Sequence, residues 1–211
     1  MAEDSPQTVQ LVQRAAQGDE DGWCDLVERY RNRLERMVAV RMDRRMQQRV
    51  NSSDIVQEVY LEADEHLADY LKDPKMPFFL WLRGITGNKL LEIHRHNLGV
   101  KMRDANREVA IDGGASMQTT AAGLAAVLVG DSTRPEEAAL RNEMRRRLEE
   151  GLDSLDPLDR EVLSLRHFEQ LTNAETAEAL GIETSAASKR YVRALKRLKG
   201  VLAFEDESRS G

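Results

Sequence analysis

A run of basic side chains near the C-terminal end offers the clearest chemistry in this sequence. Between Thr184 and Gly200 there are six basic residues and no acidic one, although the whole chain has a net charge of −6. Guanidinium and ammonium groups donate hydrogen bonds to phosphate oxygens, and their charge attracts a nucleic-acid backbone. Such segregation indicates separate surfaces for separate partners. A charge run is also typical of a solvated helix face, and both interpretations remain open at this point.

Other reactive residue types are too isolated to form a catalytic or metal site. His94 and His96 are two residues apart and do not share a helix face. His66 and His167 lie in helical patterns without companion ligands. The single cysteine, Cys24, rules out an internal disulfide and a cysteine-based zinc site, and its apolar helical surroundings predict a buried thiol. We therefore expect no catalytic residue, no metal and no cofactor.

The elements that must position the basic residues are predicted to be helices. Apolar residues recur at helical spacing, and the sequence has no convincing alternation of period two and no Asn-Gly hairpin signal. Four stripes carry the expected core: Trp23, Leu26, Val27, Tyr30, Leu34, Met37 and Val38; Val56, Val59, Ala63, Leu67 and Tyr70; Phe78, Trp81, Leu82 and Ile85; and Leu140, Met144, Leu148 and Leu152. We expect an all-α fold.

A change in composition near the middle of the chain predicts two small helical domains joined by a flexible linker. Residues 112–134 are rich in Gly, Ala, Ser and Thr and carry little charge. We expect domains at 1–98 and 135–204, a linker at 99–134 with a short helix near Leu124–Val129, and a disordered polar tail at 205–211. Pro135 and the two glutamates after it suit the first turn of the helix that follows the linker.

Local signals within 135–204 predict a helix-turn-helix. Asp156 before Pro157 is typical of a helix start. The segment 172–175, Thr-Asn-Ala-Glu, is a capping box that opens a short helix, and Gly181 can adopt the left-handed turn that ends it. Thr184 is a candidate cap for a last helix through Leu202. This arrangement makes the last helix the recognition helix.

The recognition helix of such a motif enters the DNA major groove, and its N-terminal residues face base edges. The candidates for base contacts are Ser185, Ala186, Ser188, Lys189 and Arg193. The candidates for phosphate contacts, which add salt-dependent affinity without reading sequence, are Arg190, Lys196 and Arg197.

Two segments of the N-terminal half resemble the second conserved region of sigma factors. They are residues 54–63, Asp-Ile-Val-Gln-Glu-Val-Tyr-Leu-Glu-Ala, and residues 79–89, Phe-Leu-Trp-Leu-Arg-Gly-Ile-Thr-Gly-Asn-Lys. Thr172–Leu198 resembles the fourth region. Together with Gln17-Gly18-Asp19, these segments are similar to the extracytoplasmic-function (ECF) group of the sigma-70 family of bacterial RNA polymerase. The resemblance covers about 1–98 and 135–202.

The resemblance implies that Asp54, Gln57 and Glu58 dock onto the clamp helices of the polymerase β′ subunit. All three fall off the Val56–Val59–Ala63 stripe, so we expect them to be exposed. It also implies that the C-terminal domain binds the promoter −35 element and the polymerase β flap. It assigns no role to the arginine-rich stretch Arg41–Val50, and it leaves open whether an anti-sigma factor is a further partner.

The helix from Phe78 onward is implied to open the promoter −10 element and to trap a flipped base. Asn88 matches a polar residue of the base pocket. The residues that follow on the same segment would hold the strand backbone: Lys89, His94, Arg95 and His96. Phe78 and Trp81 lie on the apolar stripe, and we expect them to be core residues rather than stacking platforms.

The main alternative is a helix-turn-helix transcriptional regulator that acts without stable polymerase association. An enzyme acting on nucleic acid would need a metal cluster or a nucleophile with its base, and a structural adaptor would not need a basic recognition helix. The apolar run near Ala121–Val129 is too short to span a bilayer, and no signal peptide is evident. We therefore expect a cytoplasmic protein with no membrane partner.

Overall fold

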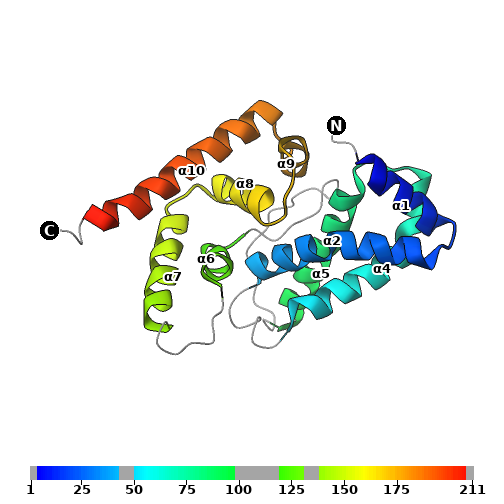
Figure 1. Cartoon of the computed structure of the whole chain (residues 1–211), viewed down its shortest axis with the longest axis horizontal. Coiled ribbons are helices and arrows are strands. Elements are labelled where there is room, and N and C mark those ends of the chain that lie inside the picture. Colours follow the sequence, from blue (N-terminus) through cyan, green and yellow to red (C-terminus); the bar gives the residue numbers. More distant parts are fainter. Residues whose placement is uncertain (1–3, 43–49, 98–118, 131–137, 208–211) are drawn as a thin grey trace. The chain divides into compact units, whose positions relative to one another are not determined.

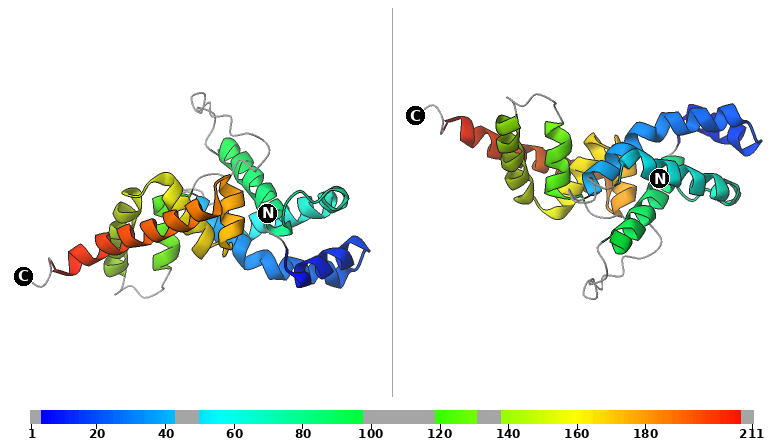
Figure 2. Two further views of the ribbon diagram at one scale, coloured as in Figure 1. Left: turned by 90° about the horizontal axis from the view of Figure 1, so that it is seen from above. Right: turned by 90° about the horizontal axis from the view of Figure 1, so that it is seen from below.

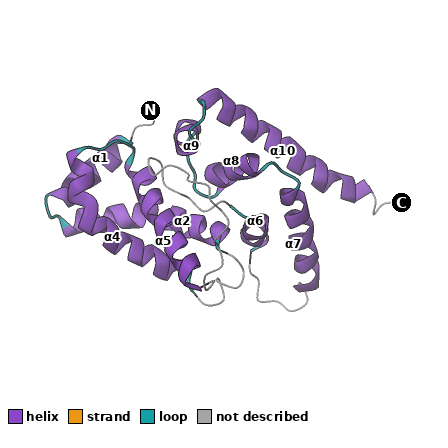
Figure 3. Cartoon of the chain, turned by 180° about the vertical axis from the view of Figure 1, so that it is seen from behind, coloured by secondary structure: helices purple, strands orange, loops and turns teal. Residues whose placement is uncertain are grey.

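The computed structural model describes residues 4–42, 50–97, 119–130 and 138–207, and every regular element in these ranges is an α-helix (Figure 3). The helices are α1 (Pro6–Ala16), α2 (Glu20–Arg41), α4 (Ser52–Lys72), α5 (Phe78–Asn97), α6 (Ala121–Val129), α7 (Ala138–Asp153), α8 (Pro157–His167), α9 (Asn173–Leu180) and α10 (Thr184–Glu207) (Figure 1). The all-α prediction is confirmed. The expected first turn at Pro135 lies outside the described residues, as does most of the expected linker.

Contacts divide the chain into two compact units. Unit 1 comprises Met1–Val38 and Gln48–Met117, and unit 2 comprises Ala39–Gln47 and Gln118–Gly211. Unit 1 therefore holds α1, α4, α5 and most of α2. Unit 2 holds α6 to α10 together with the last residues of α2.

An aromatic cluster forms the centre of unit 1. Phe78 is fully buried and lies beside Tyr30 and Tyr70, and the ring of Trp81 stacks on Tyr70 with centroids 4.7 Å apart. The Tyr30 hydroxyl lies 2.8 Å from the Thr8 hydroxyl of α1, which gives this buried polar group a partner. The predicted stripe of α4 is buried at all five positions. The core roles expected for Phe78 and Trp81 agree with this packing.

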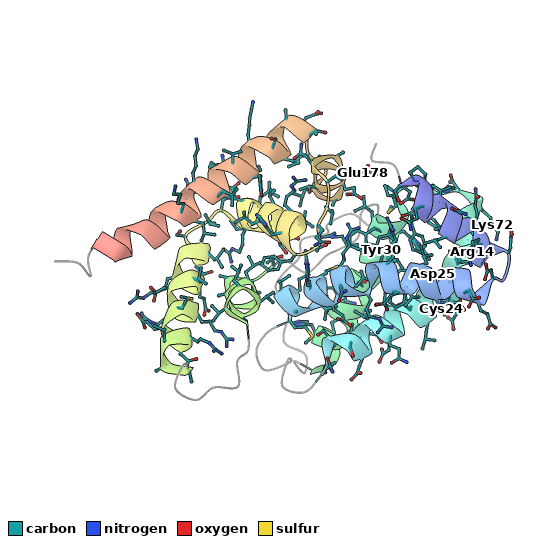
Figure 4. The ribbon with its side chains drawn as sticks, viewed as in Figure 1. Arg14, Cys24, Asp25, Tyr30, Lys72 and Glu178 are labelled. Atoms are coloured by element: carbon teal, nitrogen blue, oxygen red, sulfur yellow. The ribbon has the colours of Figure 1, made fainter. Side chains whose placement is uncertain are left out.

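The side of α2 that faces away from this cluster carries Cys24. Its thiol is exposed, so the expectation of a buried thiol was wrong (Figure 4). The buried residues of α2 include Leu26, Tyr30 and Leu34, and Cys24 lies off that face. Its neighbour Asp25 points to solvent as well, where the Arg14 guanidinium of α1 lies 3.5 Å from its carboxylate.

The core of unit 2 includes the short helix expected within the linker. Ala121, Leu124 and Ala125 of α6 are buried with Leu148 and Leu152, among others. Helix α6 packs along α7. A β-carbon on Gly123 would overlap the backbone carbonyl of Val40, so glycine permits this close approach.

The stretch to which the sequence assigned no role contributes a buried charge to unit 2. Arg41 is fully buried and forms ion pairs with Glu161 of α8 and with Glu169, whose Oε1 lies 2.6 Å from Nη1 of Arg41. The second oxygen of Glu161 accepts a hydrogen bond from the Thr119 backbone N–H at 2.9 Å. Buried charges persist only when they are paired and hydrogen-bonded in this way.

The expected stripe of α7 is only half buried. Leu148 and Leu152 are in the core, whereas Leu140 and Met144 are 61 % and 51 % exposed. The prediction was wrong for the latter two. Helical period indicates which face of a helix is apolar, but not how far along that face a neighbouring element extends.

Helix α10 is one continuous helix whose last turns project beyond the rest of unit 2 (Figures 1 and 2). It begins at Thr184, and the carbonyl of Glu183 accepts the first helical hydrogen bond, from Ala187. Thr184 is therefore the first helical residue rather than the expected cap. The helix ends at Glu207, so its last three residues extend into the tail that was expected to be disordered; residues 208–211 lie outside the described part.

Candidate nucleic-acid interface and docking face

Helix α9 and the turn after it set the position of α10. The Thr172 hydroxyl accepts from the Glu175 N–H at 3.2 Å, and the Glu175 carboxylate accepts from the Thr172 N–H at 2.6 Å. Gly181 ends α9 with a φ of 62°, and the Asn173 amide donates to the Thr184 carbonyl at 2.9 Å. The predicted capping box and left-handed turn are confirmed. They hold α9 and α10 as a helix-turn-helix, and α10 also packs along α8.

The exposed side of α10 carries most of the predicted DNA contacts. Ala187 and Ala194 are fully buried and mark the side of α10 that faces the core. Ala186 and Arg190 are half-buried, and the remaining candidates are exposed: Ser185, Ser188, Lys189, Arg193, Lys196 and Arg197. At 100° per residue, Ser185, Lys189 and Lys196 point most directly away from the core. We call these eight candidates together the α10 contact face.

Two arginines of this face are held by a buried carboxylate. Asp159 of α8 is fully buried, and its Oδ2 accepts from Nε of Arg193 at 2.7 Å. Its Oδ1 accepts from Nη2 of Arg193 at 2.6 Å and from Nη1 of Arg190 at 2.8 Å. Hydrogen bonds from Arg193 are the main cause that lowers the pKa of Asp159 below that of an ordinary aspartate.

Two exposed apolar residues on α10 were not singled out from the sequence. Val192 and Leu195 are 46 % and 37 % exposed, among polar and basic neighbours. The sequence signal that could have identified them is their place on the helical wheel, where both lie off the side marked by Ala187 and Ala194. An apolar side chain on a recognition helix can contact the methyl group of thymine.

A second exposed face lies at the start of α4. The Asn51 side chain caps this helix, accepting from the Ser53 N–H at 3.2 Å. Asp54, Gln57 and Glu58 are exposed, as their positions off the apolar stripe predicted. Leu61, which the sequence analysis missed, lies on the same side and is 65 % exposed. We call these four residues the α4 face.

The α4 face touches one of the residues expected to hold DNA. Nζ of Lys89 on α5 lies 2.9 Å from the carboxylate of Glu58 and 3.4 Å from that of Glu92. The hydrogen bond to Glu58 is the first cause that raises the pKa of Lys89. The structure thus brings together two residues that the sequence assigned to different partners.

The other residues predicted for the −10 contact follow along α5. Asn88 and Arg95 are exposed, and His94 is half-buried. His96 belongs to α5, but its side chain is outside the described part. Phe79 is 1 % exposed beneath the Arg33 guanidinium, whose carbon lies 3.5 Å from the ring centroid, so Phe79 is not accessible to a base here.

Within the described ranges, no three His, Cys, Asp or Glu side chains gather in an arrangement that could hold a metal ion. His167 lies beside Tyr191, with its Nε2 3.0 Å from the hydroxyl. None of the helices in these ranges has the length and apolar character needed to cross a membrane.

Comparison with known proteins relates both units to one class. The family described as sigma-70, region 4 matches residues 145–198, which include the second half of α7, all of α8 and α9, and α10 as far as Leu198. The RNA polymerase sigma factor NccH of Alcaligenes xylosoxydans xylosoxydans is 30 % identical over 195 residues, covering 91 % of this chain and 92 % of that protein. The ECF RNA polymerase sigma factor SigD of Mycobacterium tuberculosis (strain H37Rv) is 29 % identical over 189 residues, covering 90 % of this chain and 81 % of that one.

A solved structure shares the fold. It is that of CnrH in complex with the cytosolic domain of CnrY, with a TM-score of 0.56 and 23 % identity. The similarity covers 93 % of this chain and 97 % of that chain.

Proposed function

Because the chain belongs to the ECF group of the sigma-70 family of RNA polymerase sigma factors, we propose that its two units divide polymerase docking and promoter recognition between them. As a sigma factor, the protein binds core RNA polymerase and directs promoter-specific transcription initiation. The observation that carries this function is the 30 % identity to a named sigma factor over 91 % of the chain, which spans both units. A regulator acting without polymerase would need only the helix-turn-helix. The proposed domains are 1–98 for docking and −10 opening and 135–204 for the −35 element, with 99–134 between them, of which α6 packs in the core of unit 2.

The α4 face is the proposed docking surface for the β′ clamp helices. It combines exposed acidic and amide groups with one strongly exposed leucine. Burying the exposed Leu61 side chain in a pocket of the partner would remove apolar surface from water, while Asp54 and Gln57 would set the register of the contact. The C-terminal unit would in turn contact the β flap. As a partner of bacterial RNA polymerase, the protein would act in the cytoplasm.

The α5 residues Asn88, Lys89, His94, Arg95 and His96 are the proposed contacts with the opened −10 strand. Asn88 would bind a flipped base, and the basic residues would follow the strand backbone. The α10 contact face would bind the duplex −35 element, with Lys189 and the serines at base edges and Lys196 at a phosphate.

An anti-sigma factor is a proposed further partner. The support is that the solved structure of CnrH contains the cytosolic domain of CnrY. This partner would compete with core polymerase, so adding it should lower the amount of holoenzyme formed.

The test of docking is co-elution of the full chain with core polymerase on gel filtration, followed by run-off transcription. Asp54→Arg should weaken the complex, because it places a positive charge within the proposed acidic contact. Glu58→Arg is a poorer choice, since Glu58 also pairs with Lys89 and the change would disturb α5. Leu61→Ala should weaken the complex without any change of charge.

Asp69→Arg is the matched control for the docking test. It makes the same charge reversal on the same helix, about 22 Å further along the axis, and removes only an exposed pair with Lys72. Co-elution should be unchanged. Equal affinity of the wild-type, Asp54→Arg and Leu61→Ala chains for core enzyme would eliminate the α4 face as the docking surface.

A further inference from the structure

We infer that Asp159 is a positioning residue for promoter binding. Its carboxylate, which also binds Arg190, holds the Arg193 guanidinium so that the outer edge of that guanidinium meets a DNA phosphate. This inference rests on the proposed role of α10 and adds to it a residue on another helix. Asp159 was not among the expected contact residues, and it is fully buried. It would touch no DNA itself.

The bonding pattern at Asp159 leaves part of Arg193 available. An arginine has five N–H donors, and Asp159 takes two of them, one at Nε and one at Nη2. The edge formed by Nη1 and the second hydrogen of Nη2 faces away from the carboxylate. Because the Arg193 side chain is 49 % exposed, this edge can receive a second bidentate acceptor. A phosphate has the oxygen geometry that suits it.

The place of Arg193 on α10 favours a phosphate over a base edge. On the helical wheel, Arg190, Arg193 and Arg197 share the flank of α10 that turns toward α8, whereas Lys189 and Lys196 point directly away from the core. The N-terminal turns of a recognition helix face the base edges at the floor of the groove, whereas its flanks and its later turns, Lys196 included, lie along the backbones that border the groove. Arg193, expected from the sequence to read bases, is therefore assigned to the backbone.

Asp159 orients these arginines without neutralising the whole α10 contact face. Asp159 faces both guanidinium groups, and the Asp156 carboxylate lies 3.5 Å from Arg190, so the two arginines are balanced by two carboxylates. The positive charge of the face comes from its other exposed basic residues, Lys189, Lys196 and Arg197. The Asp159 carboxylate lies in the first turn of α8, where the helix dipole favours its ionised form. A long arginine side chain loses conformational entropy when it binds DNA. The bidentate pair with Asp159 already restricts Arg193 in the free protein, so less entropy is lost on binding.

The test uses holoenzyme assembled from core polymerase and the full chain, with promoter affinity measured over a series of salt concentrations. Asp159→Asn should weaken promoter binding on the order of tenfold, because Arg193 is no longer held. The slope of log affinity against log salt should fall in magnitude by about one, the value for one lost phosphate contact. A purely structural role would lower the melting temperature but leave the slope unchanged.

A double-mutant cycle separates positioning from independent effects. If Asp159 acts through Arg193, the chain carrying both Asp159→Asn and Arg193→Ala should bind about as weakly as Arg193→Ala alone. The inference is overturned if the two losses multiply. It is equally overturned if Asp159→Asn binds as wild type, or binds more tightly, since the latter would mean that the carboxylate competes with phosphate.

Arg193→Lys covers the case in which Asp159→Asn does not fold, because it leaves Asp159 paired with Arg190. It keeps the charge but loses the planar fork, so affinity should fall several-fold. Wild-type affinity for this variant would show that charge alone matters and would overturn the inference.

Two further variants keep this test distinct from that of the proposed function. Asp153→Asn removes another aspartate–arginine pair of unit 2, that with Arg160, and should leave promoter binding unchanged. Lys196→Ala should weaken binding whether or not Asp159 matters. If Lys196→Ala has an effect and Asp159→Asn has none, only the positioning role fails; if neither has an effect, the role of α10 fails.

Discussion

At the scale of single residues, the charge of Asp159 links stability to pH. Hydrogen bonds from Arg193 and Arg190 lower its pKa below that of an unfolded aspartate. The unfolded chain therefore takes up this proton at higher pH than the folded chain. The stability that the carboxylate contributes is complete above about pH 4 and is lost as the pH falls toward its folded pKa.

We predict that Asp159→Asn makes the free energy of unfolding depend less on pH in the acid range. The free energy of unfolding of the wild type, measured by urea titration at pH 6 and then in steps below pH 4, should fall more steeply than that of the variant. Asp153→Asn serves as the reference, because Asp153 is exposed and forms a single pair with Arg160. Parallel pH profiles for wild type and Asp159→Asn would contradict the prediction.

Gly123 has no room for a β-carbon in unit 2. We predict that Gly123→Ala destabilises unit 2 by about 1–3 kcal/mol, because its β-carbon would overlap the Val40 carbonyl and the backbone must shift. Circular dichroism follows the helices of both units, and tryptophan fluorescence follows unit 1, to which Trp23 and Trp81 belong. Loss of helicity should come before the fluorescence change.

Gly200→Ala is the control for that experiment. It lies in α10, where an added β-carbon would have no other atom within 4 Å, and alanine in a helix is favoured over glycine by about 1 kcal/mol. This change should be neutral or stabilising. If both variants are neutral, the close approach of α6 does not matter for stability.

At the scale of elements, α9 depends on its cap. The helix has only eight residues, too few to be stable by itself, so its end groups matter more than they would in a long helix. We predict that Thr172→Ala costs about 1 kcal/mol and weakens −35 binding, because α9 determines where α10 begins. Amide hydrogen exchange should quicken first in α9.

Thr184→Ala is the matched change at the start of α10. Thr184 is exposed and is the first helical residue rather than the cap, so its substitution should change exchange in α9 very little. Similar effects of both threonine variants would mean that the capping box does not stabilise α9 specifically.

Helix α7 illustrates what an element's own pattern can and cannot indicate. Its apolar residues lie at helical spacing, and α7 is a helix, yet Leu140 and Met144 are exposed while Leu148 and Leu152 are in the core. Local spacing produces the helix and its apolar face. Burial depends on the helices that pack against α7, namely α6 and α10, and the spacing within α7 does not show how far along it they extend.

At the scale of the whole molecule, both units must act from one chain. We predict that a mixture of an Asp54→Arg chain and a Lys189→Ala, Lys196→Ala chain does not restore run-off transcription with core enzyme. The first chain should fail to dock, and the second should fail to bind the −35 element. Each should keep its helicity and its other activity, as measured by circular dichroism and binding.

Recovery of transcription in the mixture would contradict this prediction, since it would mean that docking and promoter binding can be supplied by separate molecules. A mixture of wild type with either variant provides the positive control. It should transcribe in proportion to the wild-type chain present.

Much of the fold and part of the candidate site could be predicted from sequence. Apolar spacing, the Thr172–Glu175 box and Gly181 act between residues a few positions apart, so they can be recognised without a fold. The exposure of Asp54, Gln57 and Glu58 followed from the stripe beside them. The burial of Arg41 and the exposure of Cys24 did not follow, because each depends on which distant surface packs nearby.

By itself, the sequence determined that the chain is helical, where α8 and α9 begin, and that a run of six basic residues without an acidic one lies on the last helix. These features come from local propensity, capping and periodicity, which operate within a few turns. Tertiary structure alone decided which charges meet: Asp159 with Arg193, Glu58 with Lys89, and Arg41 with two glutamates. Such pairs join residues that are remote in sequence, on different helices or, for Glu169, just after α8, so only the packing of the helices brings their charges within reach.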